Sequence, residues 1–316
     1  MVVSETVQPV VSQNAKREIF GPNSLLRLHR DLAAAKSTAV RARVTAAVAS
    51  PRTATSKAYS FVTVDYPGAA ATEVLDSNGT TDVGIFIFDP SVASVNQSFT
   101  HTGDEYQIVN LPDSLQSVVF AINTLGVMAG AYSDLSSNLH GFVSNAGVIS
   151  NVDFPGSIQT MVVGINDNGD TAGIWVDAAS KTHGFVNVGG VFTSIDHPAG
   201  TSTEVTKINA SGEVAGYYED AASVSHGFLW SNGNFTSIDF PGATSTIPFG
   251  INDSGEIAGY YLDASSVSHG FLYQNNFSIV DVAGAKGTLL TRISNEGDLT
   301  GVFVDALNED HGLTAH

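Results

Sequence analysis

Apolar residues in this chain fall into short runs separated by polar, glycine-containing turns, and most of its length lacks the spacing of an amphipathic helix. Between residues 245 and 281 the runs are STIPFGIN, EIAGYYLD, SHGFLYQ and NFSIVD. Runs of this length and composition are typical of β-strands, and the polar residues between them suit tight hairpins. The pattern therefore predicts four antiparallel strands in this stretch.

The same pattern of four strands recurs along the chain. Its clearest copies start at Thr193 and Thr236, and they read TSIDHPAGTSTEVTKINASGEVAGYYEDAASVSHGFLWSNG and TSIDFPGATSTIPFGINDSGEIAGYYLDASSVSHGFLYQNN. Six copies fill residues 59–316. Their intervals are 42 to 45 residues, measured between one Asp or Asn of each copy: Asp65, Asn110, Asp153, Asp196, Asp239 and Asp281.

A four-stranded unit of this size cannot bury both of its faces alone, so successive units must stack. The chain enters the repeats with a lone fourth strand at residues 59–64 and leaves after a third strand at residues 311–315, so each end supplies what the other lacks. We therefore predict an all-β fold in which residues 58–316 form a six-bladed β-propeller of four-stranded blades, closed by the N-terminal strand. A solenoid is the alternative.

The first 57 residues form a basic N-terminal arm that lacks the repeat. Good helix formers follow Asn23 and Ser24, so we predict one helix within residues 24–48 and a linker at residues 50–57. The arm holds nine Lys/Arg and three Asp/Glu, a charge of +6, whereas the remainder holds four and twenty-eight, a charge of −24. Three roles stay open: a flexible tail, a segment resembling an organellar transit peptide, or a segment that docks on an acidic propeller. Docking on a neighbouring chain would produce a homo-oligomer.

Composition narrows the function classes. The absence of cysteine excludes disulfides, thiolate metal sites and a cysteine nucleophile. No apolar run is long enough for a membrane span, and the first residues lack the apolar core of a secretory signal. Because an acidic body repels phosphates, we expect neither nucleic acid nor an anionic membrane as a partner.

Five of the six copies place an Asp at the end of the second strand and a His six residues later, at the start of the third. A hairpin brings such residues together at one rim, and the carboxylate can then accept the imidazole proton. The pair resembles half of a hydrolase triad, but an active site needs one asymmetric constellation, so five identical pairs favour a structural role. The glycine after each His indicates a close backbone approach. The first copy has Asp89 and, in the His position, Gln97. The five pairs are Asp134/His140, Asp177/His183, Asp220/His226, Asp263/His269 and Asp305/His311.

The polar loops at residues 166–170 and 252–256 hold closely spaced oxygen atoms, as calcium loops do. They lack the length, the closing Glu and the flanking helices of an EF-hand, so we interpret them as hairpin turns. We therefore predict no metal or other cofactor, and calcium is the alternative.

Differences between copies at equivalent positions are where a single site can be built. On the first strand, the residue before a shared Ile varies among Ala121, Gly164, Lys207, Gly250 and Arg292. Because Lys and Arg are scarce in the repeats, Lys207 and Arg292 are candidates for a central site, and salt bridges between blades are the alternative. If the protein is an enzyme, we expect Glu73 to join them as a catalytic residue, with Glu204 as a further carboxylate.

Aromatic or imidazole rings stand beside the proline of four fourth-to-first-strand loops, on the face that carries the Asp/His pairs. Rings beside carboxylates can bind sugars by stacking and hydrogen bonding, and packing against the prolines is the alternative. These candidate binding residues are Tyr66, Phe154, His197 and Phe240.

The segments GINDSGEIAGYYLDASSVSHGFLY and FTSIDFPGA resemble the HAF-type extracellular repeat family, which is known chiefly from bacterial genomes. The resemblance covers residues 59–316, and it is strong in copies three to five and weak in copy one. It implies a propeller-like repeat and an extracellular or periplasmic location, and it supplies no catalytic residues.

Two functions follow as hypotheses. The first is a non-catalytic binding or interaction module that presents a glycan or protein site on the loop face of the propeller. The alternative is an enzyme of the hydrolase or lyase type that acts on a carbohydrate or another small molecule in the central funnel.

Overall fold

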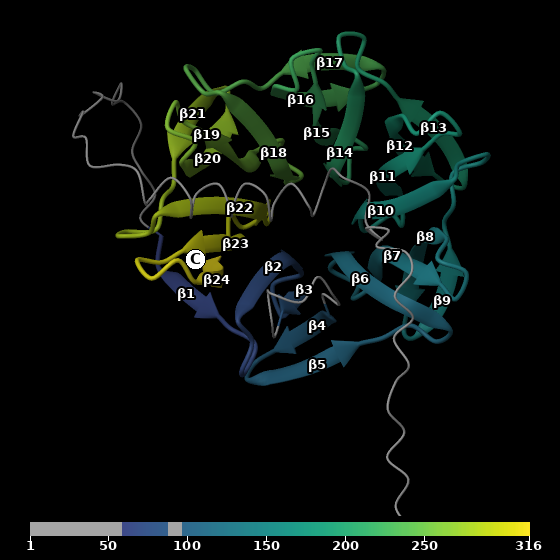
Figure 1. Ribbon diagram of the computed structural model, residues 1–316, viewed down its shortest axis with the longest axis horizontal. Helices are drawn as coiled ribbons and strands as arrows, with labels where there is room; N and C mark the ends of the chain where they lie inside the picture. Colours follow the sequence, from purple (N-terminus) through teal and green to yellow (C-terminus); the bar gives the residue numbers. More distant parts are fainter. Residues whose placement is uncertain (1–58, 88–96) are drawn as a thin grey trace, which may run out of the picture.

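The computed structural model describes residues 59–87 and 97–316, and every element assigned in them is a β-strand (Figure 1). The strands follow one another as antiparallel hairpins within four-stranded units. The all-β class predicted from the short apolar runs is thus confirmed. The predicted helix within residues 24–48, the linker at residues 50–57 and Asp89 lie outside the described residues.

We number the units by the copy of the repeat that supplies their first strand. Unit 1 holds β2 (Ala71–Ser77), β3 (Thr81–Ile87), β4 (Gln97–Thr102) and β5 (Glu105–Val109). Unit 2 holds β6 (Ser114–Ile122), β7 (Met128–Asp134), β8 (Leu139–Asn145) and β9 (Val148–Asn151). Unit 3 holds β10 (Gln159–Ile165), β11 (Thr171–Val176), β12 (Thr182–Val188) and β13 (Val191–Ile195). Unit 4 holds β14 (Ser202–Ile208), β15 (Val214–Glu219), β16 (Ser225–Ser231) and β17 (Asn234–Ser237). Unit 5 holds β18 (Ser245–Ile251), β19 (Ile257–Leu262), β20 (Ser268–Gln274) and β21 (Asn276–Ile279). Unit 6 holds β22 (Gly287–Ile293), β23 (Leu299–Val304), β24 (Asp310–Ala315) and β1 (Phe61–Val64).

Unit 6 combines strands from both ends of the described chain. β1 pairs antiparallel with β24, with Phe61 opposite Ala315 and Val64 opposite Gly312. This is the pairing that the lone strand at residues 59–64 predicts. Figure 1 shows the units arranged around a common centre, with the first strand of each unit (β2, β6, β10, β14, β18, β22) nearest to it.

Small residues on the second and third strands let these strands pack closely. A Cβ atom at Gly216 on β15 would lie 2.3 Å from the carbonyl oxygen of Glu204 and 2.7 Å from the Phe228 ring, which is fully buried. The glycine that follows each repeated His also lies close to another backbone segment. A Cβ at Gly227 would lie 2.5 Å from the carbonyl oxygen of Ile238, and one at Gly184 would lie 3.2 Å from that of Ile195. The close backbone approach predicted at the glycines after each His is confirmed. The glycine of the second strand, such as Gly216, makes a similar close approach.

The first strand of every unit carries an irregularity near the centre. Its pairing with the second strand shifts by one residue after Val74, Val119, Val162, Val205, Pro248 and Leu290. Such a β-bulge re-aims the following side chains. The positions just after the bulge are those at which the copies differ in charge.

The described part of the chain contains no helix with the length and apolar character needed to cross a membrane.

Candidate functional site

The five repeated histidines each lie between two carboxylates, in what we call the rim clusters. In unit 2, His140 Nδ1 lies 2.8 Å from Asp153 Oδ2, and its Nε2 lies 3.6 Å from Asp134 Oδ2. In the other four units, the Nδ1 distance is 2.5 to 3.2 Å and the Nε2 distance is 3.4 to 3.7 Å. The rim clusters are Asp134/His140/Asp153, Asp177/His183/Asp196, Asp220/His226/Asp239, Asp263/His269/Asp281 and Asp305/His311/Asp65.

The shorter contact of each histidine is to an Asp that is not among the predicted pairs. This second Asp precedes the turn that ends the fourth strand, and in unit 6 it is Asp65, supplied by the residues after β1. Its recurrence 12 or 13 residues after the His is a readable signal in units 2 to 5. The predicted pairs are therefore in proximity, but they form the longer half of a three-residue cluster.

The predicted Asp of each pair caps the loop between the second and third strands. Asp220 Oδ1 accepts hydrogen bonds from the backbone amides of Val224 at 2.9 Å and Ala222 at 2.8 Å. These bonds, that of Val224 first, lower the pKa of Asp220 below its usual range. The carboxylate thus stays ionised and holds the hairpin, while its other oxygen faces the imidazole.

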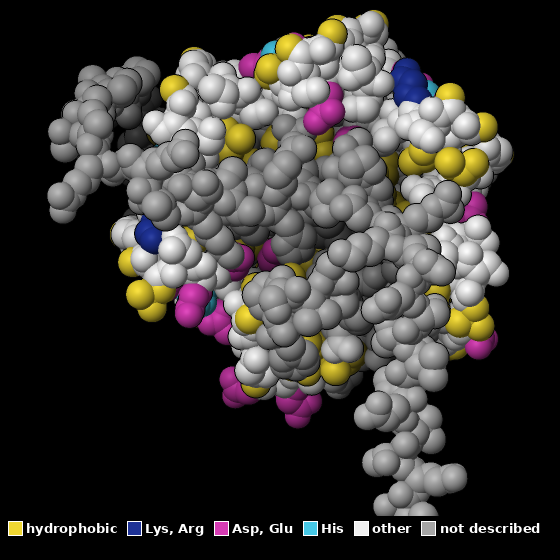
Figure 2. All heavy atoms as spheres, viewed as in Figure 1, with side chains coloured by type: hydrophobic (Ala, Val, Ile, Leu, Met, Phe, Trp, Pro, Cys, Tyr) yellow, Lys and Arg dark blue, Asp and Glu magenta, His cyan; other side chains and the backbone are white. Residues whose placement is uncertain are grey.

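Four of the rim clusters have a partly exposed histidine. Their His side chains are 21 to 30% exposed, and the Asp side chains of all five clusters are 26 to 48% exposed. On the face drawn in Figure 2, His side chains adjoin Asp or Glu side chains at the outer edge of the molecule, and Lys and Arg side chains are few. Each cluster therefore presents negatively charged oxygen acceptors to solvent.

The rim cluster of unit 3 differs from the other four in the exposure of its histidine. His183 is buried, at 9% exposure for the whole residue. The cause is Trp175, which stands where the other clusters have Tyr or Phe and stacks on His183 with ring centroids 4.3 Å apart, against 5.0 to 5.3 Å elsewhere. The larger and closer indole covers the imidazole, while Asp177 and Asp196 stay 31% and 42% exposed. His183 is therefore the least exposed of the five rim histidines, although it contacts two Asp residues as the other four do.

The four candidate binding rings lie in stacks next to the rim clusters. Phe240 stacks on Tyr261 with ring centroids 3.7 Å apart, and Tyr261 stacks on His269 at 5.1 Å. Tyr66 on Phe86, Phe154 on Trp175 and His197 on Tyr218 repeat the first contact at 3.7 to 4.2 Å. All four rings are half-buried and each has one face covered. Each ring therefore packs on an aromatic residue of the second strand, and its role in binding a sugar stays a prediction.

Unit 1 departs from this arrangement. Gln97 lies opposite Phe86, as His140 lies opposite Tyr132 in unit 2, so its alignment with the His position holds. A different histidine forms an ion-pair contact in unit 1, with His101 Nδ1 3.0 Å from Asp82 Oδ2.

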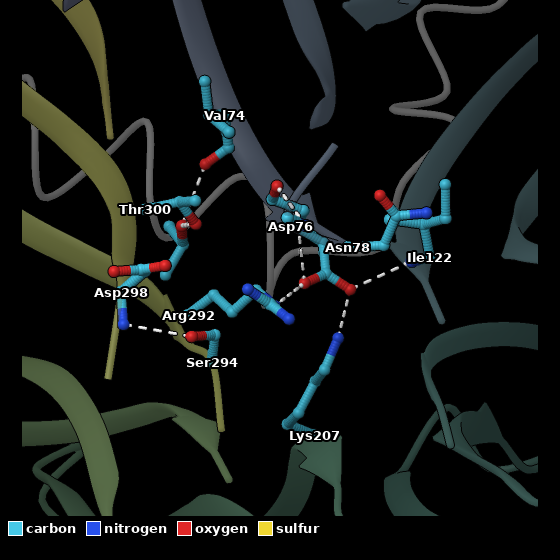
Figure 3. Close-up of polar contacts among 12 residues, drawn as sticks. Val74, Asp76, Asn78, Ile122, Lys207, Arg292, Ser294, Asp298 and Thr300 are labelled. Carbon is cyan, nitrogen blue, oxygen red and sulfur yellow. Dashed lines mark hydrogen bonds and ion pairs between the residues drawn. The ribbon is translucent and has the colours of Figure 1, made fainter. Parts of the chain in front are cut away.

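Among the described residues, the centre of the molecule holds an asymmetric group of charges, which we call the central cluster: Asp76, Lys207 and Arg292. The Lys207 ammonium forms a hydrogen bond to Asp76 Oδ2, and Arg292 Nε lies 2.8 Å from Asp76 Oδ1. The backbone amide of Ile122 also donates to Asp76 Oδ2, at 2.9 Å. Figure 3 shows Lys207 and Arg292 converging on Asp76 from different strands. One carboxylate on unit 1 thus binds units 2, 4 and 6.

Asp76 stands at the same strand position as Lys207 and Arg292, directly after the bulge of β2. The sequence comparison anchors this position on the Ile that follows it, and β2 has Ser77 in place of that Ile. Anchoring on the bulge would have found Asp76. The prediction that Lys207 and Arg292 approach the centre is correct. There they form salt bridges to another unit, as the alternative interpretation of these residues expected.

Glu73 and Glu204 occupy another layer of the first strands. Both side chains are buried, at about 1% exposure. Glu204 Oε2 accepts a hydrogen bond from the hydroxyl of Tyr217 at 2.5 Å. The equivalent positions in the other units are apolar and buried: Val118, Met161, Ile247 and Leu289. Neither carboxylate is placed where a substrate in solution could reach it.

Asparagines on the hairpins between first and second strands join neighbouring units. Asn166 Oδ1 accepts from the backbone amides of Asn168 and Asp170, and its Nδ2 donates to the carbonyl of Asn209 in the next unit at 3.0 Å. Asn123, Asn209 and Asn252 repeat this bond to the following unit. We call this series the asparagine ladder.

The two loops with calcium-like spacing belong to these hairpins. Both oxygens of Asp167 accept hydrogen bonds from Thr124 of unit 2, at 2.9 and 2.6 Å. Asp253 likewise accepts from Ala210 and Asn295 of the units on either side. Their oxygens link hairpins of adjacent units, as turn residues would.

No protein-family model and no curated protein matches this chain. Solved structures that are similar include AofleA from Arthrobotrys oligospora, at 14% identity and a TM-score of 0.49, over 80% of this chain and 85% of that chain. A six-bladed β-propeller lectin from Aleuria aurantia, with a fucose recognition mode, has 12% identity and a TM-score of 0.47 over 81% and 90%. TolB from Acinetobacter baumannii has 10% identity and a TM-score of 0.49 over 78% and 63%. At such identities and TM-scores the ligand of one protein does not transfer to another.

Proposed function

We propose that residues 58–316 form a closed six-bladed β-propeller that acts as a non-catalytic binding module for a glycan, through the face that carries the rim clusters. The pairing of β1 with β24 and the similar strand plan of the units support closure. The resemblance to HAF-type extracellular repeats supports membership of that family and an extracellular or periplasmic location for this module.

The observation that carries the binding function is the fivefold repetition of two exposed carboxylates around a histidine. The carboxylates keep this arrangement even in unit 3, where His183 is buried. An active site needs a single arrangement of unlike groups, whereas binding to a polymer gains from several similar sites that act together. A repeated site can be weak in each unit and still hold a polymer firmly. The repeated rim therefore favours a multivalent binding module.

The chemistry of the rim cluster favours a hydroxyl-rich ligand. Ionised carboxylates only accept hydrogen bonds, and sugar hydroxyls can donate them. The edges of half-buried rings, such as Phe240 beside Asp239, add apolar contact to the same surface. An anionic glycan would be repelled by the two carboxylates of each rim cluster, so the ligand class is a neutral glycan.

The enzyme alternative draws on Glu73, Lys207 and Arg292. Glu73 is buried, and Lys207 and Arg292 are both bound to the Asp76 carboxylate. Both cations are therefore engaged by one buried carboxylate, and Glu73 lies in another layer of the first strands, so these groups are not poised as a general acid and base toward a common substrate position.

Isothermal titration calorimetry of the full chain with methyl glycosides of galactose, mannose, glucose and fucose tests this function, together with a neutral polysaccharide of any sugar that binds. We expect weak binding of the monosaccharide at several sites per chain, and much tighter binding of the polysaccharide. Asp239→Asn should remove about one in five of the monosaccharide sites.

The matched control is Asp104→Asn, which makes the same change of charge at an exposed turn residue outside the rim clusters. It should leave the number of sites unchanged. A single site per chain, loss of all binding with Asp239→Asn, or turnover of a glycoside would each refute the multivalent module.

A further inference from the structure

Apart from the rim clusters, the described part of the molecule has a cavity of about 70 Å³ at its centre, lined by isoleucines of the first strands and by the hairpins of the asparagine ladder. Lys207 and Arg292 form part of its wall, together with the ends of β6, β10, β14, β18 and β22 and the hairpins that follow them. One water needs only about 10–15 Å³ of such space, so a group of several atoms can enter. The cavity is separate from the rim clusters, none of whose residues line it.

The buried charges beside this cavity are unbalanced. Two cationic side chains, 12% and 14% exposed, share the one carboxylate of Asp76, which is 1% exposed. Leaving a buried charge without a counter-charge is costly. Two of the four Lys/Arg residues in the repeats are placed here, in a part of the chain with twenty-eight Asp/Glu.

Three routes would relieve the imbalance: loss of the Lys207 proton, solvation, or an incoming anion. Burial lowers the pKa of Lys207, while Asp76 opposes this shift and Arg292 adds to it. The site thus favours either deprotonation of Lys207 or the binding of an anion. An anion would satisfy the site and keep Lys207 protonated.

The donors suit an oxyanion. The contacts with Asp76 use one N–H of the guanidinium and one of the ammonium, out of five and three. A planar guanidinium forms paired hydrogen bonds with carboxylates and phosphates, and an ammonium adds a point charge. The ladder amides of Asn123, Asn166, Asn209 and Asn252 donate to carbonyls of the next unit, so Lys207 and Arg292 are the charged donors that line the cavity.

We infer that this cavity is a binding site for one small oxyanion, held by Lys207 and Arg292. Asp167 and Asp253 also line it, but both are exposed, and solvent and salt screen exposed charges more than buried ones. Their presence at the entrance disfavours multiply charged ligands. A carboxylate group is therefore the preferred occupant, and a phosphate group is the related one.

Calorimetric titration of the full chain with sodium acetate and with sodium phosphate, at constant ionic strength set by sodium chloride, tests the site. We expect saturable binding of one anion per chain, and Kd at least about tenfold higher in Lys207→Met and Arg292→Met. Removing either cation leaves the other paired with Asp76, so both variants should fold, which circular dichroism and urea unfolding can check. Tighter binding of acetate assigns a carboxylate site, and tighter binding of phosphate assigns a phosphate site.

The matched control is Lys286→Met, which removes a cation whose Nζ bonds Asn308 Oδ1 at 2.7 Å, outside the cavity. Its Kd should stay within about twofold of the wild type. If a Met variant fails to fold, Lys207→Arg and Arg292→Lys keep the charge and should retain binding. The absence of saturable binding of both anions, or a Kd in Lys207→Met and Arg292→Met equal to that of the wild type, would overturn the site.

Discussion

The rim clusters and the central cluster are built on the same units and obey opposite rules. At the rim, five units place a His between two Asp residues with nearly the same distances. At the centre, the residue directly after the bulge of the first strand differs among the units. Three units have a charged residue there (Asp76, Lys207, Arg292), and the other three have a small one (Ala121, Gly164, Gly250). A repeated fold therefore offers two kinds of surface: one that multiplies a contact and one that combines unlike residues across units.

The difference also separates two kinds of stability. Each rim cluster lies at the surface and within one unit, and unit 6 takes Asp65 from the residues after β1, so the loss of a cluster should be felt locally. Asp76 is buried and binds residues of three other units, so its loss should be felt by the whole assembly of units. Exposed ion pairs contribute little to stability, whereas breaking a buried one leaves uncompensated charge.

The largest expected effect comes from Asp76→Ala. It leaves the Lys207 and Arg292 cations buried without their carboxylate and removes the acceptor of the Ile122 amide. We expect the free energy of unfolding in urea to fall by about 3–5 kcal/mol. The rim comparison is Asp239→Ala, whose carboxylate is 41% exposed and which should lose about 1 kcal/mol or less. Equal losses in the two variants would remove the distinction between centre and rim.

Much of the fold could be predicted because the repeat presents each structural rule several times. The four apolar runs, the glycine-ended hairpins and the glycine after each His recur in copy after copy, so a chance pattern is averaged out. Copy one shows the limit. There Ser77 replaces the shared Ile, which hides Asp76 as the partner of Lys207 and Arg292.

The candidate site was less predictable because contacts between strands decide it. Asp and His on one hairpin could be paired from sequence, but the nearer carboxylate belongs to the end of the fourth strand. The repeat also suggests that all five histidines are alike, although the indole of Trp175 buries His183. Likewise, Asp76 lies 131 residues from Lys207 along the chain. The repeat identifies which residues occupy equivalent positions. The packing of the strands determines which of them are in contact and which are buried.

A middle-sized effect is expected when a rim histidine is removed. His226→Ala loses contacts to two carboxylates and stacking on Tyr218, so we expect about 1–2 kcal/mol less stability in urea unfolding. His269→Ala should behave alike in unit 5. Because the clusters share no residues, the double variant should lose the sum of the two within about 0.5 kcal/mol. A clear departure from additivity would mean that neighbouring clusters are coupled, and that the rim is not a set of independent sites.

The smallest effect is a pH dependence that differs in sign between two histidines. A hydrogen bond to Asp281 is the main cause that raises the pKa of His269, against the opposing effect of burial. Folding therefore favours its protonated form, and the stabilisation is fully present below the unfolded pKa of about 6.5 and lost as the pH rises through the folded pKa. Burial is the main cause that lowers the pKa of His197, so folding favours its neutral form. The stabilisation from His197 is present above a pH of about 6.5 and is lost as the pH falls through its folded pKa.

The chain's own repeats supply the substitutions that test this difference. Copy one has Gln97 at the position of His269, and other copies have Phe at the position of His197. Urea unfolding at acid and alkaline pH should show His269→Gln losing more stability relative to wild type at acid pH, and His197→Phe comparing more favourably with wild type there. If each variant differs from wild type by the same amount at both pH values, the two histidines do not titrate differently on folding, and the Asp281 contact gives His269 no charge preference.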